Sequence, residues 1–253
     1  ADAEATFEAK LDGGSWSAAT RPATLMDLTD GAYTYQVRAT DSAGNTGDPV
    51  SVTWTVDTVG PETTFTYQPD SLINYESVGF LFEANENDAT FEGKLDDEPW
   101  AEVTSPLPLL DLSDGEHTFQ VRATDLAGNT GEVESATWTI DTEAPETTFS
   151  AVPDSLTNSD SAELAFESNE PDSTFEARLD GGSWGTVTSP VTLEDLSEGT
   201  HLYWVRASDP AGNTGPSENV SWKVDTQAPV ATFDSAPSGV ISNNSVTFTF
   251  SAN

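Results

Sequence analysis

The sequence Thr90-Phe-Glu-Gly-Lys-Leu-Asp96 occurs three times with small changes, also as Thr6-Phe-Glu-Ala-Lys-Leu-Asp12 and as Thr174-Phe-Glu-Ala-Arg-Leu-Asp180. Successive copies are 84 residues apart (90 − 6 and 174 − 90), and a tryptophan follows each copy at the same distance. A fixed period of this kind is the sequence signature of a repeat architecture. The chain of 253 residues therefore contains three periods of one folding unit and one further residue.

Further along each period, Asp125-Leu-Ala-Gly-Asn-Thr-Gly131 recurs at residues 41–47 and 209–215. Before it, Phe119, Val121 and Ala123 alternate with polar residues, which is the pattern of a half-buried strand. Gly, Asp, Asn, Ser and Pro separate such segments, as turns require. About seven short strands in each period predict an all-β protein of tandem immunoglobulin-like β-sandwiches arranged end to end.

The composition excludes several classes of function. There are 44 acidic and 8 basic residues, so the formal net charge is −36 and binding to nucleic acid through a basic groove is not credible. No apolar stretch is long enough to span a bilayer, so we expect no direct membrane insertion. The chain has no cysteine, which excludes disulfides and thiolate metal sites. Cations are the expected small partners of so acidic a protein.

Four motifs resemble the tandem bacterial Ig-like repeats of large surface and secreted proteins. They are Thr104-Ser-Pro106, Asp111-Leu-Ser-Asp-Gly115, Val121-Arg-Ala-Thr-Asp-Leu-Ala-Gly-Asn129 and Trp138-Thr-Ile-Asp-Thr-Glu-Ala-Pro145. The resemblance covers the full length and implies an extracellular or cell-surface location. The chain departs from many such repeats in lacking their cysteine pair, so stapling by disulfides is not expected.

In the usual frame of these repeats, a domain begins just after Asp-Thr-x-x-Pro. This frame predicts complete domains at residues 58–141 and 142–225. Residues 1–57 would lack their first two strands, and residues 226–253 would supply the first two strands of a further domain. Two explanations fit this division. Copies of the chain join head to tail by strand complementation, or the sequence is a window of a longer tandem chain.

Acidic residues open the repeated turn and also mark the point where one domain passes to the next. Carboxylates gathered at such a junction are the hard oxygen ligands that calcium prefers, and in the adhesins that this chain resembles, calcium stiffens the junctions. The competing interpretation is that Asp and Asn bond their own turns. The predicted calcium donors are Asp41, Asn45, Asp57, Asp125, Asn129, Asp141, Asp209, Asn213 and Asp225.

Other polar residues favour structural roles. Six of the eight basic residues occupy two repeated strand positions, where cross-strand ion pairs are expected. Tyr33 is predicted to anchor a tyrosine corner, with His117 and His201 at the equivalent positions. Trp204 is a candidate for contact with a sugar, although packing between domains is the favoured interpretation, and any surface or carbohydrate ligand is unknown.

Catalytic motifs are missing, and an enzyme rarely needs its site in triplicate, so no enzyme is expected. The sequence predicts a structural protein of an extracellular filament or cell-surface fibre. The alternative is a stalk segment of a giant calcium-stiffened adhesin whose binding tip lies elsewhere.

Overall fold

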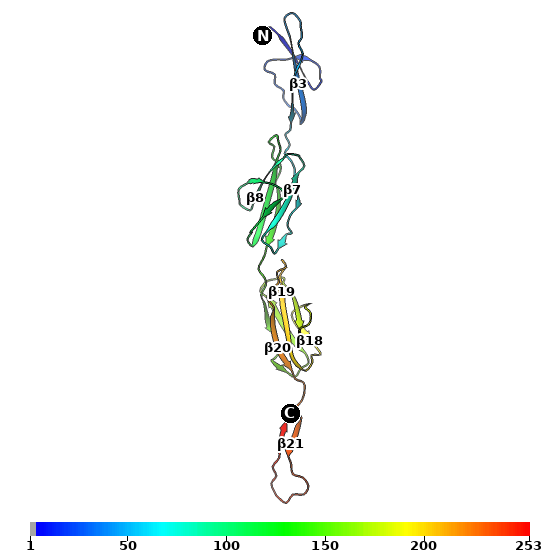
Figure 1. The fold of residues 1–253 in the computed structure, drawn as a ribbon, viewed down its shortest axis with the longest axis vertical. Helices are drawn as coiled ribbons and strands as arrows, with labels where there is room; N and C mark the ends of the chain where they lie inside the picture. The colour runs from blue at the N-terminus through cyan, green and yellow to red at the C-terminus, as the bar shows by residue number, and fades with distance from the viewer. Residues whose placement is uncertain (1–3) are drawn as a thin grey trace. The chain divides into compact units, whose positions relative to one another are not determined.

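The computed structural model describes residues 4–253, and within this range the chain forms strands and turns without a helix (Figure 1). Contacts between residues divide the chain into two units. One holds the described residues up to Ser71 together with Ser77–Thr139, and the other holds Leu72–Glu76 together with Ile140–Asn253. No helix among residues 4–253 is long and apolar enough to cross a membrane. The all-β class predicted from the sequence is confirmed.

The strands of the first unit come from two repeats. They are β1 (Thr6–Leu11), β2 (Ser17–Ala18), β3 (Gly31–Thr40), β4 (Val50–Val56), β5 (Thr63–Tyr67), β7 (Val78–Ala84), β8 (Thr90–Leu95), β9 (Ala101–Val103), β10 (Leu107–Leu109), β11 (Gly115–Thr124) and β12 (Glu134–Ile140). The first four strands form one sheet in the order β2-β1-β3-β4. The rest form a sandwich with β10-β7-β5 in one sheet and β12, β11, β8 and β9 side by side in the other.

The second unit repeats this plan. Its strands are β6 (Leu72–Ile73), β13 (Thr147–Ala151), β14 (Leu156–Thr157), β15 (Ala162–Ser168), β16 (Thr174–Leu179), β17 (Gly185–Val187), β18 (Val191–Leu193), β19 (Gly199–Ser208), β20 (Glu218–Val224), β21 (Ala231–Ser235) and β22 (Thr249–Ala252). The sheets β13-β15-β18 and β14-β20-β19-β16-β17 make the sandwich, and β21-β22 is a separate two-stranded sheet. The two sandwiches confirm the predicted immunoglobulin-like fold.

Aromatic and branched side chains fill each sandwich. In residues 58–139, the Phe80 ring lies 4.7 Å from the Phe119 ring and 5.3 Å from the Trp138 ring, between centroids, and all three side chains are buried. Leu164, Tyr203 and Trp222 take these places in the second unit and are also buried. The alternation seen in the sequence places these residues on the inner faces of paired strands, so burial of apolar surface stabilises both sandwiches.

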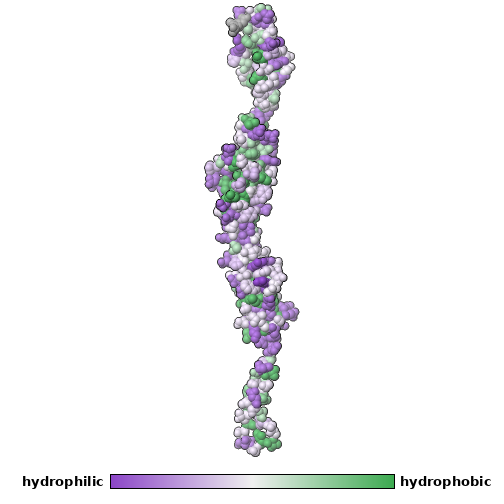
Figure 2. Space-filling view, viewed as in Figure 1, coloured by the Kyte–Doolittle hydropathy of each residue, from purple (hydrophilic) through white to green (hydrophobic). Residues whose placement is uncertain are grey.

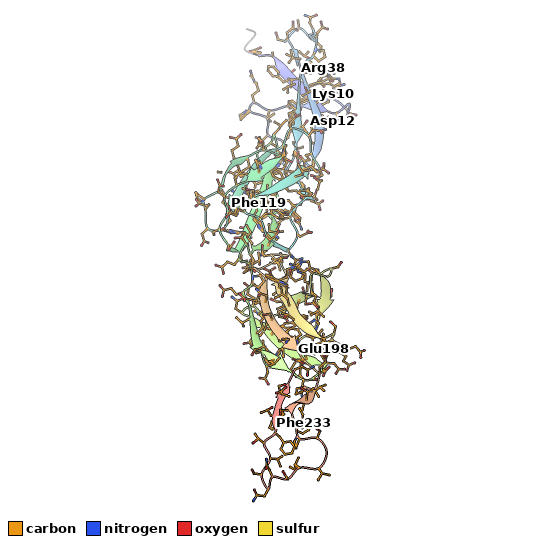
Figure 3. All side chains as sticks on the ribbon, turned by 60° about the horizontal axis from the view of Figure 1, so that its bottom comes forward. Lys10, Asp12, Arg38, Phe119, Glu198 and Phe233 are labelled. Atoms are coloured by element: carbon orange, nitrogen blue, oxygen red, sulfur yellow. The ribbon has the colours of Figure 1, made fainter. Side chains whose placement is uncertain are left out.

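Cross-strand ion pairs form at one of the two basic positions for which they were predicted. Arg38, which is labelled in Figure 3, donates through Nε and Nη2 to Glu8 Oε2 at 2.9 and 2.8 Å. Its guanidinium lies 4.3 Å from the Trp16 ring centroid. The equivalent pairs are Arg122 with Glu92 and Arg206 with Glu176. At the other position, Lys10, Lys94 and Arg178 lie over the rings of Trp16, Trp100 and Trp184. Trp204, in the second unit, lies beneath the Arg178 guanidinium at 5.6 Å.

The predicted corner bond is confirmed in all three repeats. The Tyr33 hydroxyl donates to the Thr29 carbonyl at 2.6 Å, and Nε2 of His117 and of His201 lies 2.8 Å from the Ser113 and Ser197 carbonyls. Each histidine also has Nδ1 against a carboxylate, Asp96 at 2.9 Å or Asp180 at 2.7 Å. Because both partners accept, an imidazolium that donates from both nitrogens fits this corner best.

These corners predict a pH dependence of stability. Burial lowers the pKa of His117, but the Ser113 carbonyl and Asp96 outweigh it and raise this pKa above 6.5. The Ser197 carbonyl raises the pKa of His201, burial opposes it, and Asp180 adds to the rise. A raised folded-state pKa gives stabilisation that is complete below the unfolded pKa of about 6.5 and is lost as pH rises through the folded-state pKa.

We therefore expect the melting temperature of the two sandwiches to fall as pH rises above about 6.5. Thermal denaturation at a series of pH values will measure the slope. The variant with both His117→Tyr and His201→Tyr copies the corner of Tyr33 and should lose that slope. An NMR titration that places both folded-state pKa values below 6.5 would contradict the prediction.

Candidate metal sites

The repeated Asp-x-Ala-Gly-Asn turn holds its own aspartate in a fixed position. Asp125 Oδ1 accepts a bond from the Asn129 backbone N–H at 2.9 Å, and Oδ2 accepts one from the Asn129 side-chain amide at 2.8 Å. Gly128, at φ +94°, turns the chain back between them. The same pair of bonds joins Asp41 to Asn45 and Asp209 to Asn213. The interpretation that these residues bond their own turns is thus confirmed.

The asparagine of the turn also binds the segment that leads into the domain, residues 57–61 or 141–145, called here the entering segment. The Asn129 side-chain amide donates to the Asp57 carbonyl at 3.0 Å, and that of Asn213 donates to the Asp141 carbonyl at 2.7 Å. The amide nitrogen thus faces both aspartates. This orientation makes Asn129 and Asn213 positioning residues for the carboxylates.

The last glycine of the turn allows the entering segment to pack directly on the turn. A Cβ on Gly131 would lie 1.8 Å from the Pro61 carbonyl oxygen, and a Cβ on Gly215 would lie 1.8 Å from that of Pro145. Both prolines are fully buried side chains. Only glycine permits this approach of two backbones.

Three carboxylates meet beside each of these contacts. Oxygen atoms of Asp57, Glu86 and Asp125 all lie within 4.8 Å of one another, and so do those of Asp141, Glu170 and Asp209. Each triplet takes one carboxylate from the entering segment, one from the residues that follow β7 or β15, and one from the repeated turn. In the second unit, Glu143 and Asp172 line the same surface hollow as Asp141 and Glu170 and add further negative charge.

The electrostatics of the triplets are those of an anionic site. Burial and the charges of Asp57 and Asp125 raise the pKa of Glu86, and burial with the charges of Asp141, Asp209 and Glu143 raises that of Glu170. The bond from Asn129 lowers the pKa of Asp125. Carboxylates that repel one another in this way favour the binding of a proton or a metal cation.

The basic residues of the chain are engaged elsewhere. Their partners are a glutamate, an aspartate or an aromatic ring, as follows: Arg38–Glu8, Arg122–Glu92, Arg206–Glu176, Lys223–Asp225, Lys10–Trp16, Lys94–Trp100, Arg178–Trp184 and Arg21–Phe7. Since these account for all eight lysines and arginines, a cation that neutralises a triplet has to come from solution.

The triplets have the chemistry of a site for a hard divalent cation. Calcium takes six to eight oxygen ligands from carboxylates, carbonyls and water at 2.3–2.6 Å. Three carboxylates on three different segments supply part of this set, and water can complete it. A cation bound there would tie the entering segment to the domain.

The structure brings together four of the predicted aspartates and leaves two apart. Asp57 with Asp125 and Asp141 with Asp209 belong to triplets. Asp41 and Asn45 form the same turn, but among residues 4–253 no triplet includes Asp41; the residue 84 positions before Glu86 is Asp2, outside the described residues. Asp225 lies 3.6 Å from Lys223 Nζ.

Glu86 and Glu170 were not among the predicted donors. Glu86 follows β7 and Glu170 follows β15, at the same place in the 84-residue period and directly after Asn85 and Asn169. That repeated acidic position, at the same sheet end as the turn, is the signal that could have identified them.

The sequence profile of the family described as bacterial Ig-like domain matches residues 2–58 and 68–142, which together make up more than half of the chain. The chain therefore belongs to the bacterial Ig-like domain family. No curated protein matches it.

Solved structures with a similar fold include modules of several proteins. Fibronectin(III)-like modules of Clostridium thermocellum CbhA are 15% identical, with 64% of this chain and 94% of that chain covered and a TM-score of 0.42. A structure concerning host cell surface retention of a 1.5-MDa bacterial ice-binding adhesin is 15% identical, covers 88% and 87%, and has a TM-score of 0.43. A tetra-tandem repeat in the extending region of a large adhesion protein is 17% identical, covers 91% and 69%, and has a TM-score of 0.34.

Proposed function

We propose that the chain is a structural, non-enzymatic repeat protein of an extracellular filament or cell-surface fibre, in which copies join head to tail and calcium fixes the domain junctions. The observation that carries the proposal is the pair of equivalent carboxylate triplets, each spanning the entering segment and the domain that it enters. A repeated domain with a repeated junction suits a load-bearing or spacing role better than catalysis does.

Calcium would act on the junction through three segments at once. Asp57 belongs to the segment before the domain, Asp125 to the turn after β11 and Glu86 to the residues after β7. The carbonyl of Asp57 is already held by Asn129. A cation between the carboxylates would remove their repulsion and resist bending of the segment away from the turn, so the junction would become stiffer.

The charge of the chain supports a location outside the cell. With a formal net charge of −36, the carboxylates of the protein repel one another unless salt or bound cations screen them. Calcium sites in extracellular modules often bind at about 10⁻⁴–10⁻³ M, so even a weak site would be filled where calcium is abundant.

Calcium binding is tested by thermal denaturation and by isothermal titration calorimetry of the 253-residue chain. We expect saturable binding at the two triplets and a rise in melting temperature with calcium, which excess chelator reverses. At 100 times the dissociation constant, one site adds about 2.7 kcal/mol to the free energy of unfolding. Magnesium is the matched control and should act more weakly, because it demands near-ideal octahedral geometry. A melt unchanged by calcium and chelator would overturn the calcium part of the proposal.

The alternative is a stalk segment of a giant calcium-stiffened adhesin, which shares the same junctions. The mass of the denatured protein from its natural source separates the two. A mass near 26.9 kDa supports separate subunits, whereas a much larger covalent chain supports the stalk.

A further inference from the structure

Trp204 lies in the middle of β19, on the outer face of the sandwich of residues 142–225. It pairs in register with Arg178 of β16 on one side and with Asn219 of β20 on the other. Its two neighbours along β19 are buried, so the Trp204 side chain points away from the core, where it is partly exposed. In the other two repeats the equivalent residue is a glutamine, Gln36 or Gln120.

Arg178 connects two tryptophans on this outer face. Its guanidinium lies 5.6 Å from the ring centroid of Trp204 and 4.8 Å from that of Trp184. The other repeats have a lysine in this place, Lys10 or Lys94. A guanidinium is planar and stacks on aromatic faces, which suits it to a place beside two rings better than an ammonium group. The side chains of Arg178, Trp184 and Trp204 are called here the Trp204 cluster.

The positive charge of Arg178 has no carboxylate beside it. Among residues 4–253, Arg178 forms no ion pair, and its buried Nε has no hydrogen-bond partner. The neighbouring Arg206 differs, because Glu176 accepts a bond from it at 2.7 Å. A guanidinium has five N–H donors, and burial of such donors is unfavourable unless an acceptor meets them. The Trp204 cluster therefore favours an acceptor from solution.

The surroundings of the Trp204 cluster carry little of the negative charge of the chain. Hydrophilic residues make up much of the surface drawn in Figure 2, and the formal net charge is −36. In the sandwich of residues 58–141, the turn and strand after β8 carry three acidic residues, which neutral residues replace after β16. The replacements are Asp97 by Gly181, Glu98 by Gly182 and Glu102 by Thr186. An anion at the cluster thus meets less local repulsion, and salt screens the more distant charges.

The sheet leaves only side chains for a ligand to contact. β19 lies between β20 and β16, and β16 lies between β19 and β17, so the backbone groups of β19 and β16 are paired within the sheet. A peptide cannot add a strand there. The surface offers indole rings, a guanidinium and the Asn219 amide. A flat ring with polar groups on its rim suits this surface, because its face packs on an indole and its rim meets planar donors.

We propose that the Trp204 cluster binds a sugar unit that carries a carboxylate, of the uronic acid class found in acidic polysaccharides. The carboxylate lies on the Arg178 guanidinium, which can bond two oxygens at once. The apolar face of the pyranose ring packs on Trp204, and Asn219 offers its amide to a ring hydroxyl. This binding goes beyond the proposed function and does not use its calcium sites.

An NMR titration of the indole N–H signals of the 253-residue chain tests the site. The probes are tetrasaccharides of galacturonic, mannuronic and guluronic acid, and the buffer contains chelator, so calcium cannot bridge the sugar to the carboxylate triplets. We expect at least one probe to shift the Trp184 and Trp204 signals saturably. Trp100, which has Lys94 in place of arginine, is the internal control and should not shift. The fully methyl-esterified form of the same tetrasaccharide should bind about tenfold or more weakly, because it has lost the charged acceptor.

Two variants take their residues from the other repeats, so both should fold. Trp204→Gln copies Gln120 and should weaken binding about tenfold or more through loss of the ring face. Arg178→Lys copies Lys94 and keeps the charge but loses the planar fork, so it should reduce the preference for the acid over its ester by a similar factor. Lys223→Gln is the control for charge, because Lys223 is exposed on the same face of β20 outside the cluster, and it should bind like the unmodified chain.

Four results would overturn the proposal. One is the absence of saturable shifts at Trp184 and Trp204 with all three acids. Another is equal affinity for the acid and its methyl ester. The third is a loss of binding in Lys223→Gln as large as that in Trp204→Gln, which would indicate attraction to general charge. The fourth is a tetraglutamate peptide that binds as tightly as the uronates, which would make the occupant an acidic peptide. Each leaves the calcium test on the carboxylate triplets unaffected.

Discussion

Replacement of Gly215 by alanine is expected to destabilise the domain of residues 142–225 and to remove its response to calcium. The new Cβ would lie 1.8 Å from the Pro145 carbonyl oxygen, and Pro145 is fully buried. The backbone of Gly215 is outside the left-handed region, so the effect is one of contact and not of backbone strain. Overpacking of this kind costs about 1–3 kcal/mol.

The loss of calcium response follows from the position of the same segment. Relief of the clash requires residues 141–145 to move from the turn, which would break the 2.7 Å bond between the Asn213 amide and the Asp141 carbonyl. Asp141 would then leave Glu170 and Asp209. Chemical denaturation gives the change in the free energy of unfolding, and calorimetric titration should show one calcium site fewer.

Gly131→Ala should have the same effect on the preceding domain, and Gly47→Ala is the matched control. A Cβ on Gly47 has 3.9 Å to its nearest neighbour, so in dilute, monomeric protein this variant should unfold like the unmodified chain. If Gly215→Ala and Gly47→Ala behave alike, the close packing of the entering segment does not matter for stability or for the metal site.

Much of the fold could be predicted because the repeats make each local pattern visible three times. The alternation of Phe119, Val121 and Ala123 gave the inward face of β11, and these residues are buried. The corner could be predicted from Tyr33, because its hydroxyl bonds a residue only four positions away. Local patterns of this kind depend on the period of a strand and on the chemistry of one turn.

The carboxylate that lies against Nδ1 of each histidine could not be predicted. Asp96 and Asp180 reach the imidazoles from 21 residues away. Their place follows from the pairing of β8 with β11 and of β16 with β19, which sequence patterns alone do not align.

The metal sites show the same division between local and distant information. The turn aspartates Asp125 and Asp209 could be identified as candidates, since the turn is a continuous motif. Glu86 and Glu170 belong to no such motif: 39 residues (125 − 86 and 209 − 170) separate each from its turn, and only their repeated place after Asn85 and Asn169 marks them in the sequence. The donor direction of Asn129 also depends on the entering segment, whose carbonyl it bonds.

Glu170→Gln is expected to have opposite effects on stability in the absence and presence of calcium. Burial and the charges of Asp141, Asp209 and Glu143 raise the pKa of Glu170. Without a cation, an amide removes this repulsion, so the variant should melt at a higher temperature than the unmodified chain in chelator. With calcium, the loss of one charged ligand should weaken binding about tenfold or more, since affinity follows the number of ligand charges, and the order of the melting temperatures should reverse.

Acidification should reproduce part of this effect in the unmodified chain. Because the folded-state pKa of Glu170 lies above its ordinary value of 4.5, protonation favours the folded state, and metal-free stability gains from this group as pH falls through the folded-state pKa. Protons also compete with calcium for the site, so calcium affinity should fall over the same range. Glu86→Gln should behave in the same way in its own domain.

Glu167→Gln is the matched control, because Glu167 is an exposed carboxylate on β15 outside the triplet. It removes one negative charge, as Glu170→Gln does, so it separates the repulsion within the triplet from the general effect of the net charge of −36. If Glu170→Gln and Glu167→Gln change both melting temperatures equally, the three carboxylates do not act as one site. If only Glu170→Gln reverses the order with calcium, the cation binds where Asp141, Glu170 and Asp209 meet.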